Sequence, residues 1–314
     1  MEVGQNESGY TLTRIVGRGS RAIVWEAERS DTGERVALKV LDTVADSAPD
    51  RLRAEFSAQV RLDHPNIVSV HEIIEFDGKL SLVAELVDGC DLREYIDRYK
   101  PDTTAAVRVF GGIMRGLAAA QDQGLVHRDL KPGNILMTAG NQSIPKISDF
   151  GIVKAENSLD LTQTGMVLGT LRYMPPEQLQ NPSGVDQRAD LFSAGCILFE
   201  LLTHKRLFDG PNKVALMNAV RMGTHTPFPE DLDPELRSLI ETLIHPDREQ
   251  RPASAADVLE RMGLSIDPEV ELTVPIPIEL APKKLPFIWI TLGFAALLIA
   301  GIALGLGITA LVSR

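Results

Sequence analysis

The spacing of apolar residues changes near residue 90, and this change constrains the fold more than any other feature. Before it, short β-branched segments such as "YTLTRIVG", "AIVWEAER" and "RVALKVL" alternate with Gly-containing turns, which is typical of strands. After it, longer runs such as "TTAAVRVFGGIMRGLAAAQDQG" and "ADLFSAGCILFELLT" have helical spacing. The sequence therefore predicts an α+β fold, with a strand-rich small lobe at about 10–87 and a helical large lobe at about 91–262.

The small lobe is expected to contain one helix among its strands. In "DRLRAEFSAQVRL", residues 50–62, the side chains of Leu52, Phe56 and Val60 fall on one stripe. The segments "IVSVHEIIEF" and "LSLVAELV" that follow are predicted strands joined by an Asp-Gly turn. Residues 1–9 precede this lobe as a tail.

Charge and cysteine content argue against two classes of protein. The formal net charge of −11 disfavours nonspecific nucleic-acid binding, because such binding needs a positive surface. Two cysteines among 314 residues cannot build a disulfide framework, and they suit a reducing compartment. Cys196 lies in the apolar run "FSAGCILFELL", so we expect a buried thiol there.

The C-terminal part of the chain has a composition of its own. Residues 285–312 contain no charged side chain and exceed the roughly 20 residues that cross a bilayer, which predicts a single transmembrane helix. Residues 263–284 are Pro-rich and acidic, as in a juxtamembrane linker. Lys283 and Lys284 favour a cytoplasmic amino-terminal side, with almost no tail beyond the cell membrane. The start of the chain has no signal-peptide pattern.

Small residues recur within this predicted span. Gly301 and Gly305 form a G-x-x-x-G pattern, and Ala303 and Gly307 repeat its spacing, which lets two membrane helices approach closely. Small residues are also common in single spans, so the pattern is compatible with a homodimer and with a lone helix.

Two short motifs place acids at Asp129 and Asp149. The first is "HRDLKPGNIL", residues 127–136, and the second is "SDFGIV", residues 148–153. Acids in such segments either serve turns and caps or hold a metal ion and take part in chemistry.

A glycine-containing loop and a lysine lie upstream of these motifs. In "VGRGSRAIV", residues 16–24, Gly17 and Gly19 let the backbone approach an anion closely. Lys39 lies in the apolar strand "VALKV", where a buried ammonium group needs a partner, and Glu55 is the expected one. A hairpin followed by a surface lysine would explain each part alone, but the combination favours a phosphate-binding lysine.

In their order along the chain, these motifs resemble those of eukaryotic-type (Hanks-type) serine/threonine protein kinases, most of all the bacterial membrane-anchored members. The resemblance covers residue 10 to about 262 and rests on "GRGSRAIV", "VALK", Glu55, "HRDLKPGN", "DFG", "GTLRYMPPE", Asp190 and Arg251. It implies the bilobal protein-kinase fold, with a small antiparallel β-sheet lobe and a larger α-helical lobe. Ala22 departs from the pattern, because the family carries its third loop glycine there.

The resemblance gives each acid a role. Asp129 would accept the proton of the substrate hydroxyl, and Lys131 would stabilise the phosphoryl group in transfer. Asn134 and Asp149 would hold Mg²⁺, with Mn²⁺ as an alternative, because such ions prefer oxygen ligands. Lys131 in "DLKPGN" and Thr170 in "GTLRYMPPE" further imply serine or threonine substrates, with Thr170 expected beside Asp129.

The resemblance also implies an ATP site. The residues that would contact or orient ATP are Val16, Gly17, Arg18, Gly19, Val24, Ala37, Lys39, Glu55, Glu85, Val87 and Leu136. Ala84, directly before Glu85, is a small gatekeeper, which implies a pocket behind it that is open to bulky inhibitors. Ordinary strand packing explains a small residue there equally well.

The same resemblance implies regulation and one structural ion pair. The regulatory residues would be Arg128, Thr162, Thr164 and Thr170. Arg128 would pair with a phosphate on the activation segment, residues 149–177, and Thr162 and Thr164 match the pair that bacterial relatives autophosphorylate. Glu177 and Arg251 would form a buried ion pair in the large lobe.

The sequence thus predicts an ATP-dependent serine/threonine protein kinase that acts on protein substrates and is anchored in the membrane, with its catalytic domain in the cytoplasm. A pseudokinase scaffold would suit Ala22, but it would not need the intact Lys39, Asp129, Asn134 and Asp149. A small-molecule kinase of the same fold would not need the full activation segment or "PPE" with its arginine.

Overall fold

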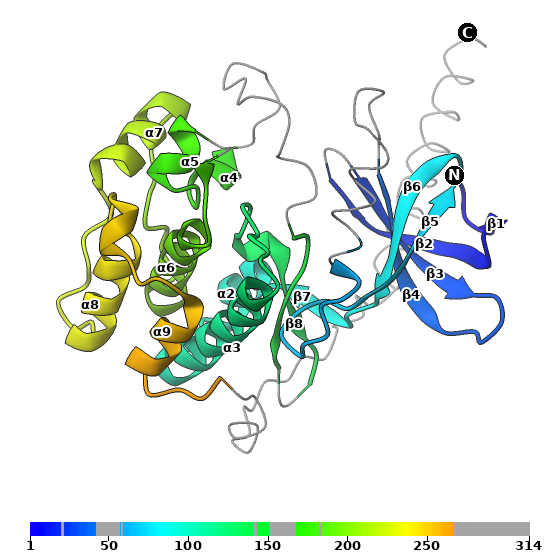
Figure 1. Ribbon diagram of the computed structural model, residues 1–314, viewed down its shortest axis with the longest axis horizontal. Coiled ribbons are helices and arrows are strands. Elements are labelled where there is room, and N and C mark those ends of the chain that lie inside the picture. Colours follow the sequence, from blue (N-terminus) through cyan, green and yellow to red (C-terminus); the bar gives the residue numbers. More distant parts are fainter. Residues whose placement is uncertain are drawn as a thin grey trace, which may run out of the picture. The chain divides into compact units, whose positions relative to one another are not determined.

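Six strands form the antiparallel sheet of the small lobe (Figure 1). The computed structural model has these strands at β1 (Asn6–Glu7), β2 (Tyr10–Arg18), β3 (Ala22–Arg29), β4 (Arg35–Leu41), β5 (Val70–Phe76) and β6 (Lys79–Glu85). Their order in the sheet is β1-β2-β3-β4-β6-β5. One face carries the core cluster, because side chains alternate between the two faces of a strand. The cluster consists of Tyr10, Leu12, Trp25, Ala27, Val36, Leu38, Val40, Phe76 and Val83.

The structure describes residues 1–19, 22–41, 57, 59–140, 143–150, 168–181 and 184–266, all of which belong to one compact unit, Met1–Ile278. In this part of the chain, no helix combines the length and the apolar character that crossing a membrane requires. The predicted span at 285–312 and residues 267–284 of the predicted linker lie outside the described residues.

The large lobe is built around α6 (Arg188–Thr203), whose residues from Ala189 to Leu201 are buried. A helix that is apolar on all sides has to be surrounded by protein. Here α3 (Thr103–Asp122) and α8 (Pro234–Leu243) contact it, and α9 (Ala255–Arg261) packs on α3. The shorter helices are α2 (Leu92–Tyr99), α4 (Leu168–Leu171), α5 (Pro176–Gln180), α7 (Lys213–Met222), and the 3-10 turns η1 (Pro132–Asn134) and η3 (Arg248–Gln250).

Cys196 on α6 is 1% exposed, which confirms the predicted buried thiol. Burial raises the pKa of this thiol well above its ordinary value. Three helices of the large lobe begin at residues that are typical N-caps. Asp91, Asp102 and Ser254 accept hydrogen bonds from backbone N–H groups in the first turns of α2, α3 and α9.

A second sheet lies between the two lobes and positions both acid motifs (Figure 1). It consists of β7 (Gly89–Asp91), β8 (Ile135–Thr138) and β9 (Pro145–Ile147). Ser148 N donates to Asn134 O at 2.9 Å, so the end of the first motif lies beside the start of the second. The small lobe joins here too, because Val68 N donates to Ile147 O at 2.9 Å.

The predicted strands at 10–17, 22–29 and 35–41 are confirmed, and so is the Asp-Gly turn, where Asp77 and Gly78 have φ of 54° and 68°. The predicted apolar stripe of the small-lobe helix is wrong at Val60, which is 38% exposed. Its neighbour Gln59 is buried instead, at 7% exposure, because its amide has a hydrogen-bond partner far away in the sequence. Leu52 and Phe56 lie outside the described residues.

The predicted ion pair between Glu177 and Arg251 is confirmed. Arg251 Nη1 lies 2.7 Å from Glu177 Oε1, Arg251 Nη2 lies 2.9 Å from Oε2, and the arginine side chain is fully buried. The pair joins α5 to the turn after η3, and it stacks the guanidinium over Phe192 of α6 at 4.9 Å. It therefore fixes the segment that precedes α6 against the end of the large lobe.

Replacing Arg251 by methionine is expected to lower the free energy of unfolding by about 3–5 kcal/mol, because it leaves the Glu177 carboxylate without its buried partner. Urea denaturation followed by circular dichroism measures this loss. Arg98→Met is the matched control, since Arg98 forms an exposed pair with Glu94 four residues earlier and should cost less than about 0.5 kcal/mol. Equal losses for both variants would contradict a structural role for the buried pair.

Candidate active site

The loop between β2 and β3 is the first part of the site. Gly17 pairs with Val24 across the hairpin, and Gly19 N donates to Ala22 O at 2.8 Å. Val16 is 47% exposed, and an added Cβ on Gly17 would meet no atom within 4 Å, so the backbone of this strand end is open to an approaching group. Ala22 is only 8% exposed and packs with Leu41, Leu80 and Leu82, so its methyl group belongs to the small-lobe core.

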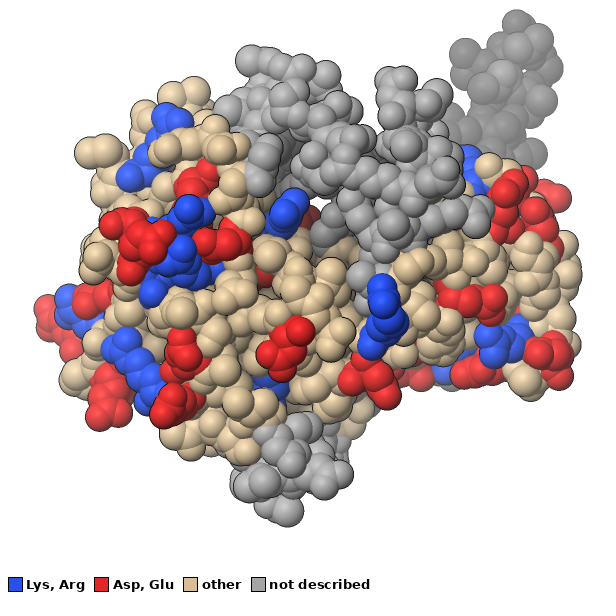
Figure 2. All heavy atoms as spheres, viewed as in Figure 1, with Lys and Arg blue, Asp and Glu red and all other residues tan. Residues whose placement is uncertain are grey.

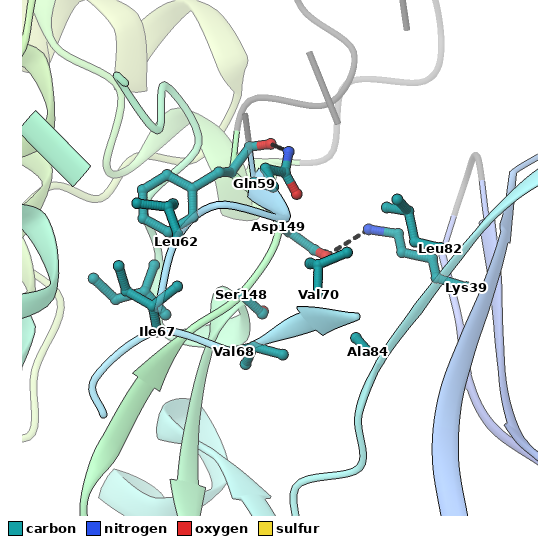
Figure 3. A pocket seen from close by; sticks show the side chains of 12 residues that line it. Lys39, Gln59, Leu62, Ile67, Val68, Val70, Leu82, Ala84, Ser148 and Asp149 are labelled. Carbon is teal, nitrogen blue, oxygen red and sulfur yellow. Dashed lines mark hydrogen bonds and ion pairs between the residues drawn. The ribbon is translucent and has the colours of Figure 1, made fainter. Parts of the chain in front are cut away.

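Lys39 reaches from β4 toward the second acid motif. Its ammonium group lies 2.5 Å from Asp149 Oδ1, and the two side chains point toward one another in Figure 3. The lysine side chain is 17% exposed, so the carboxylate offsets much of the cost of its burial. The expected partner Glu55 lies outside the described residues.

Asp129 lies at the centre of a small polar network. Lys131 Nζ donates to Asp129 Oδ2 at 2.8 Å and to Thr170 Oγ1 at 3.2 Å. Asn134 Nδ2 donates to the backbone carbonyl of Asp129 at 2.8 Å. The predicted residues of the first motif and Thr170, some forty positions apart, therefore meet around one carboxylate.

Asp190 of α6 holds the backbone of this loop. Its carboxylate accepts the N–H of His127 at 2.7 Å and the N–H of Arg128 at 2.9 Å. Burial raises the pKa of the Asp190 carboxyl, and the two backbone N–H groups and His127 act against that rise. Arg128 adopts a φ of 63°, a left-handed conformation that non-glycine residues rarely take, so the loop conformation depends on these contacts.

The donor set near Asp149 suits a magnesium ion. Asn134 commits its amide nitrogen to Asp129, so its amide oxygen is the atom left for a cation. The carboxylate of Asp149 is 41% exposed, and it lies directly after Ser148, whose N–H is bonded to Asn134 O. One carboxylate and one amide oxygen, both hard ligands, fit an ion that takes its remaining ligands from water and phosphate. Among the described residues, no group of three or more His, Cys, Asp or Glu side chains gathers as for a protein-only metal cage.

The segment around Glu85 is held from both sides. Its backbone N–H donates to Ser69 O at 2.9 Å, and its side chain accepts from Ser69 N and from Lys146 Nζ, each at 2.8 Å. Val87 follows in the connection between β6 and β7. Of the predicted adenine contacts, Val24 on β3 and Ala37 on β4 lie on adjoining strands of the small-lobe sheet, whereas Leu136 lies on β8 of the second sheet.

A cavity of about 50 Å³ lies behind Ala84, between β4, β6 and the Asp149 segment (Figure 3). Its polar lining comes from Lys39, Gln59, Ser148 and Asp149, and its apolar lining includes Leu82. The small residue at position 84 therefore does border a pocket, as the sequence suggested.

The segment after the predicted phosphorylation sites is tied to the large lobe. Tyr173 OH donates to Glu200 Oε2 at 2.6 Å, and Arg93 of α2 pairs with the same carboxylate through Nη2 at 2.7 Å. Burial raises the pKa of Tyr173. Tyr173 N donates to Thr170 O at 3.2 Å, so these bonds connect the turn that carries Thr170 to the large lobe. Gly151, Thr162 and Thr164 lie outside the described residues.

Sequence reasoning missed three polar residues at this site: Gln59, Lys146 and Gln178. Gln59 and Gln178 are buried and donate to backbone carbonyls of Phe150 and Arg128. The sequence offers one weak signal for each glutamine. Gln59 lies in a segment with helical spacing, and Gln178 directly follows "PPE", so a buried polar side chain could be expected at both positions. Their partners lie more than forty positions away, so no local pattern reveals the contacts.

Comparison with known proteins agrees with this geometry. A family model for the protein kinase domain matches residues 10–262. Serine/threonine-protein kinase PknA of Mycobacterium tuberculosis is 36% identical over 297 residues, which span 90% of this chain and 68% of the relative. The probable serine/threonine-protein kinase PknB of Lactococcus lactis is 35% identical over 240 residues, 75% of this chain and 38% of the relative. Serine/threonine-protein kinase PknJ of M. tuberculosis is 39% identical over 213 residues, 66% of this chain and 36% of the relative.

The bilobal fold and the family match together define a protein kinase. The chain belongs to the Hanks-type serine/threonine protein kinases, and it is therefore a transferase of the class that uses ATP and Mg²⁺ to phosphorylate proteins.

Replacing Thr170 by valine is expected to lower kcat about fivefold, because Lys131 loses one of its two hydrogen-bond partners beside Asp129. Initial rates of peptide phosphorylation measure this change. Thr170→Ser keeps the hydroxyl group and is expected to retain most of the wild-type rate. If serine and valine lower the rate equally, the Lys131 contact is not what Thr170 contributes.

Proposed function

We propose that Asp129 and Lys131 transfer the γ-phosphoryl group of ATP to a serine or threonine hydroxyl of a protein. The position of Lys131 Nζ, 2.8 Å from Asp129 Oδ2 and 3.2 Å from Thr170 Oγ1, is the observation that carries this proposal. It puts a proton acceptor and a cation side by side. Phosphoryl transfer needs such a pair, because the reaction moves one proton and concentrates negative charge on phosphate oxygens.

In the proposed reaction, Asp129 orients the incoming hydroxyl group and accepts its proton. The oxygen of that hydroxyl then bonds to phosphorus while the bond from phosphorus to the departing ADP breaks. Lys131 balances the charge of the group in transfer. Asp190 contributes indirectly, because it keeps the backbone of His127 and Arg128 in place.

Asn134 and Asp149 are the proposed magnesium ligands, and the ion, when bound, neutralises charge on the ATP phosphates. Lys39 contacts Asp149 and is proposed to bind phosphate oxygens from the small-lobe side, with Glu55 as its second partner. The exposed backbone of Gly17 and Gly19, flanked by Val16 and Arg18, is proposed to cover the phosphates.

The adenine ring is proposed to lie between Val24 and Ala37 on one side and Leu136 on the other. The backbone of Glu85 and Val87 would bond to its edge. Because the N–H of Glu85 is bonded to Ser69, its carbonyl is the group available to adenine.

We further propose control through phosphorylation of the activation segment. Arg128 lies directly before Asp129, and within the described residues its guanidinium forms no ion pair. A phosphate on Thr162 or Thr164 would supply an anionic partner, since arginine binds phosphate with two parallel hydrogen bonds.

Incubation of the full-length protein in detergent with ATP and Mg²⁺ is expected to place phosphate on Thr162 or Thr164. Phosphosite mapping by mass spectrometry measures this outcome. Asp129→Asn is the control and is expected to remain unmodified, because it lacks the proton acceptor. Wild-type protein that binds ATP but phosphorylates neither itself nor a peptide would contradict the proposed catalytic role.

Residues 285–312 are proposed to anchor the kinase in the cell membrane, with the catalytic domain in the cytoplasm. The uncharged length of this segment and the two lysines before it support the proposal. The Gly301 and Gly305 spacing suits pairing of two copies, which would raise the local concentration for phosphorylation in trans.

Cells that express the full-length chain are expected to retain it in the membrane pellet after carbonate extraction at high pH. A variant that lacks residues 285–312 is expected in the supernatant, because it has lost the apolar segment. Immunoblots of the two fractions give the comparison, and Asp129→Asn controls for effects of kinase activity. Release of the full-length chain by carbonate would exclude an integral span.

A further inference from the structure

Two buried glutamines bind backbone carbonyls next to the two active-site acids. Gln59 is 7% exposed, and its Nε2 donates to the carbonyl oxygen of Phe150 at 2.6 Å. Gln178 on α5 is 5% exposed, and its Nε2 donates to the carbonyl oxygen of Arg128 at 2.7 Å. Phe150 directly follows Asp149, and Arg128 directly precedes Asp129.

Each carbonyl lies in a turn with an intrinsically unfavourable backbone position, which is Arg128 itself in one turn and Asp149, directly before Phe150, in the other. Arg128 has a φ of 63° and Asp149 has a φ of 64°, in the left-handed region that side chains with a Cβ disfavour. Such conformations persist only where surrounding contacts impose them. The two acids proposed for proton transfer and metal binding therefore depend on contacts from outside their own turns.

Other groups fix one side of each turn. Asp190 binds the N–H groups of His127 and Arg128, and the His127 ring packs on the Phe150 ring with centroids 4.8 Å apart. The carbonyls on the far side of each turn are bound by Gln59 and Gln178. A buried amide carries a desolvation cost that only a hydrogen bond offsets, so each glutamine favours the one backbone arrangement that accepts its N–H.

The two glutamines come from different parts of the fold. Gln59 belongs to the small lobe and lines the cavity that also holds Lys39 and Asp149 (Figure 3). Gln178 belongs to the large lobe, one residue after Glu177 of the buried ion pair. Each acid is thus supported from a separate element.

We propose that Gln59 and Gln178 are positioning residues, with Gln59 setting the place of Asp149 and Gln178 setting the place of Asp129. This inference rests on the proposed roles of the two acids. It makes the two glutamines separable, because of the two acids only Asp149 is a proposed metal ligand.

Gln59→Met keeps the length of the side chain and removes the donor. The Mg²⁺ concentration for half-maximal activity is expected to rise about fivefold to tenfold. Saturating Mg²⁺ is expected to restore kcat, because the ion binds only the arrangement with Asp149 in place and so favours it. Calorimetric binding of a non-hydrolysable ATP analogue at graded Mg²⁺ should show the same shift without any turnover.

Gln178→Met is expected to lower kcat about fivefold at every Mg²⁺ concentration and to leave the Mg²⁺ dependence of analogue binding unchanged. Gln187→Met is the control for loss of an amide-to-carbonyl hydrogen bond away from the site, since Gln187 Nε2 donates to Ala253 O at 2.8 Å in an exposed bond between α6 and the turn before α9. It is expected to match wild-type protein in both measurements. If Gln59→Met does not fold, Gln59→Asn, which retracts the amide by one methylene group, carries the same comparison.

A wild-type Mg²⁺ dependence in folded Gln59→Met or Gln59→Asn would overturn the proposal, and so would identical profiles for the Gln59 and Gln178 variants. A loss of kcat in Gln59→Met that saturating Mg²⁺ leaves uncorrected would also overturn it. If wild-type protein binds the analogue but transfers no phosphate, the proposed function fails, while the binding measurement still decides the role of Gln59.

Discussion

The active site depends on one buried carboxylate, that of Asp190. Inside α6 it has no access to water, so its two hydrogen bonds to the N–H groups of His127 and Arg128 have no solvent substitute. These bonds fix the loop that carries Asp129, and Asp129 in turn receives Lys131 and Asn134. Lys131 then reaches Thr170 on the far side of the site. The polar network thus begins at a helix in the middle of the large lobe.

The two lobes meet at the strand that leads into Asp149. Ile147 of β9 receives the N–H of Val68 from the small lobe, and Lys146 beside it binds the side chain of Glu85. Lys39 contacts Asp149 two residues further along. On the face that Figure 2 shows, acidic and basic side chains are interspersed. This distribution suits individual ion pairs between neighbouring side chains and does not form one surface of a single charge.

The sequence predicted most strands and the long helices of this molecule, but not the contacts that support its candidate site. Strand β3 follows from its β-branched composition and flanking turns, and α6 follows from the length of its apolar run, whereas α2 and α7 are short segments that the sequence analysis did not single out. Hydropathy alone favours burial of Val60 over burial of Gln59. It contains no information on the hydrogen bond from Gln59 to the backbone carbonyl of Phe150, which makes burial of the glutamine possible. The Lys39 contact with Asp149 and the Lys146 contact with Glu85 likewise join residues that are distant in sequence.

The burial of α6 on all sides has a consequence for synthesis at the ribosome. Its apolar surface needs α8, which begins about thirty residues after α6 ends. At translation rates of about 5–20 residues per second, synthesis of α8 begins roughly 2–6 s after α6 is complete. During this interval the nascent chain carries an apolar helix that α3 can cover on one side only, and exposed apolar segments are the kind that chaperones bind. The same helix that anchors the active site is therefore exposed to aggregation until the domain closes.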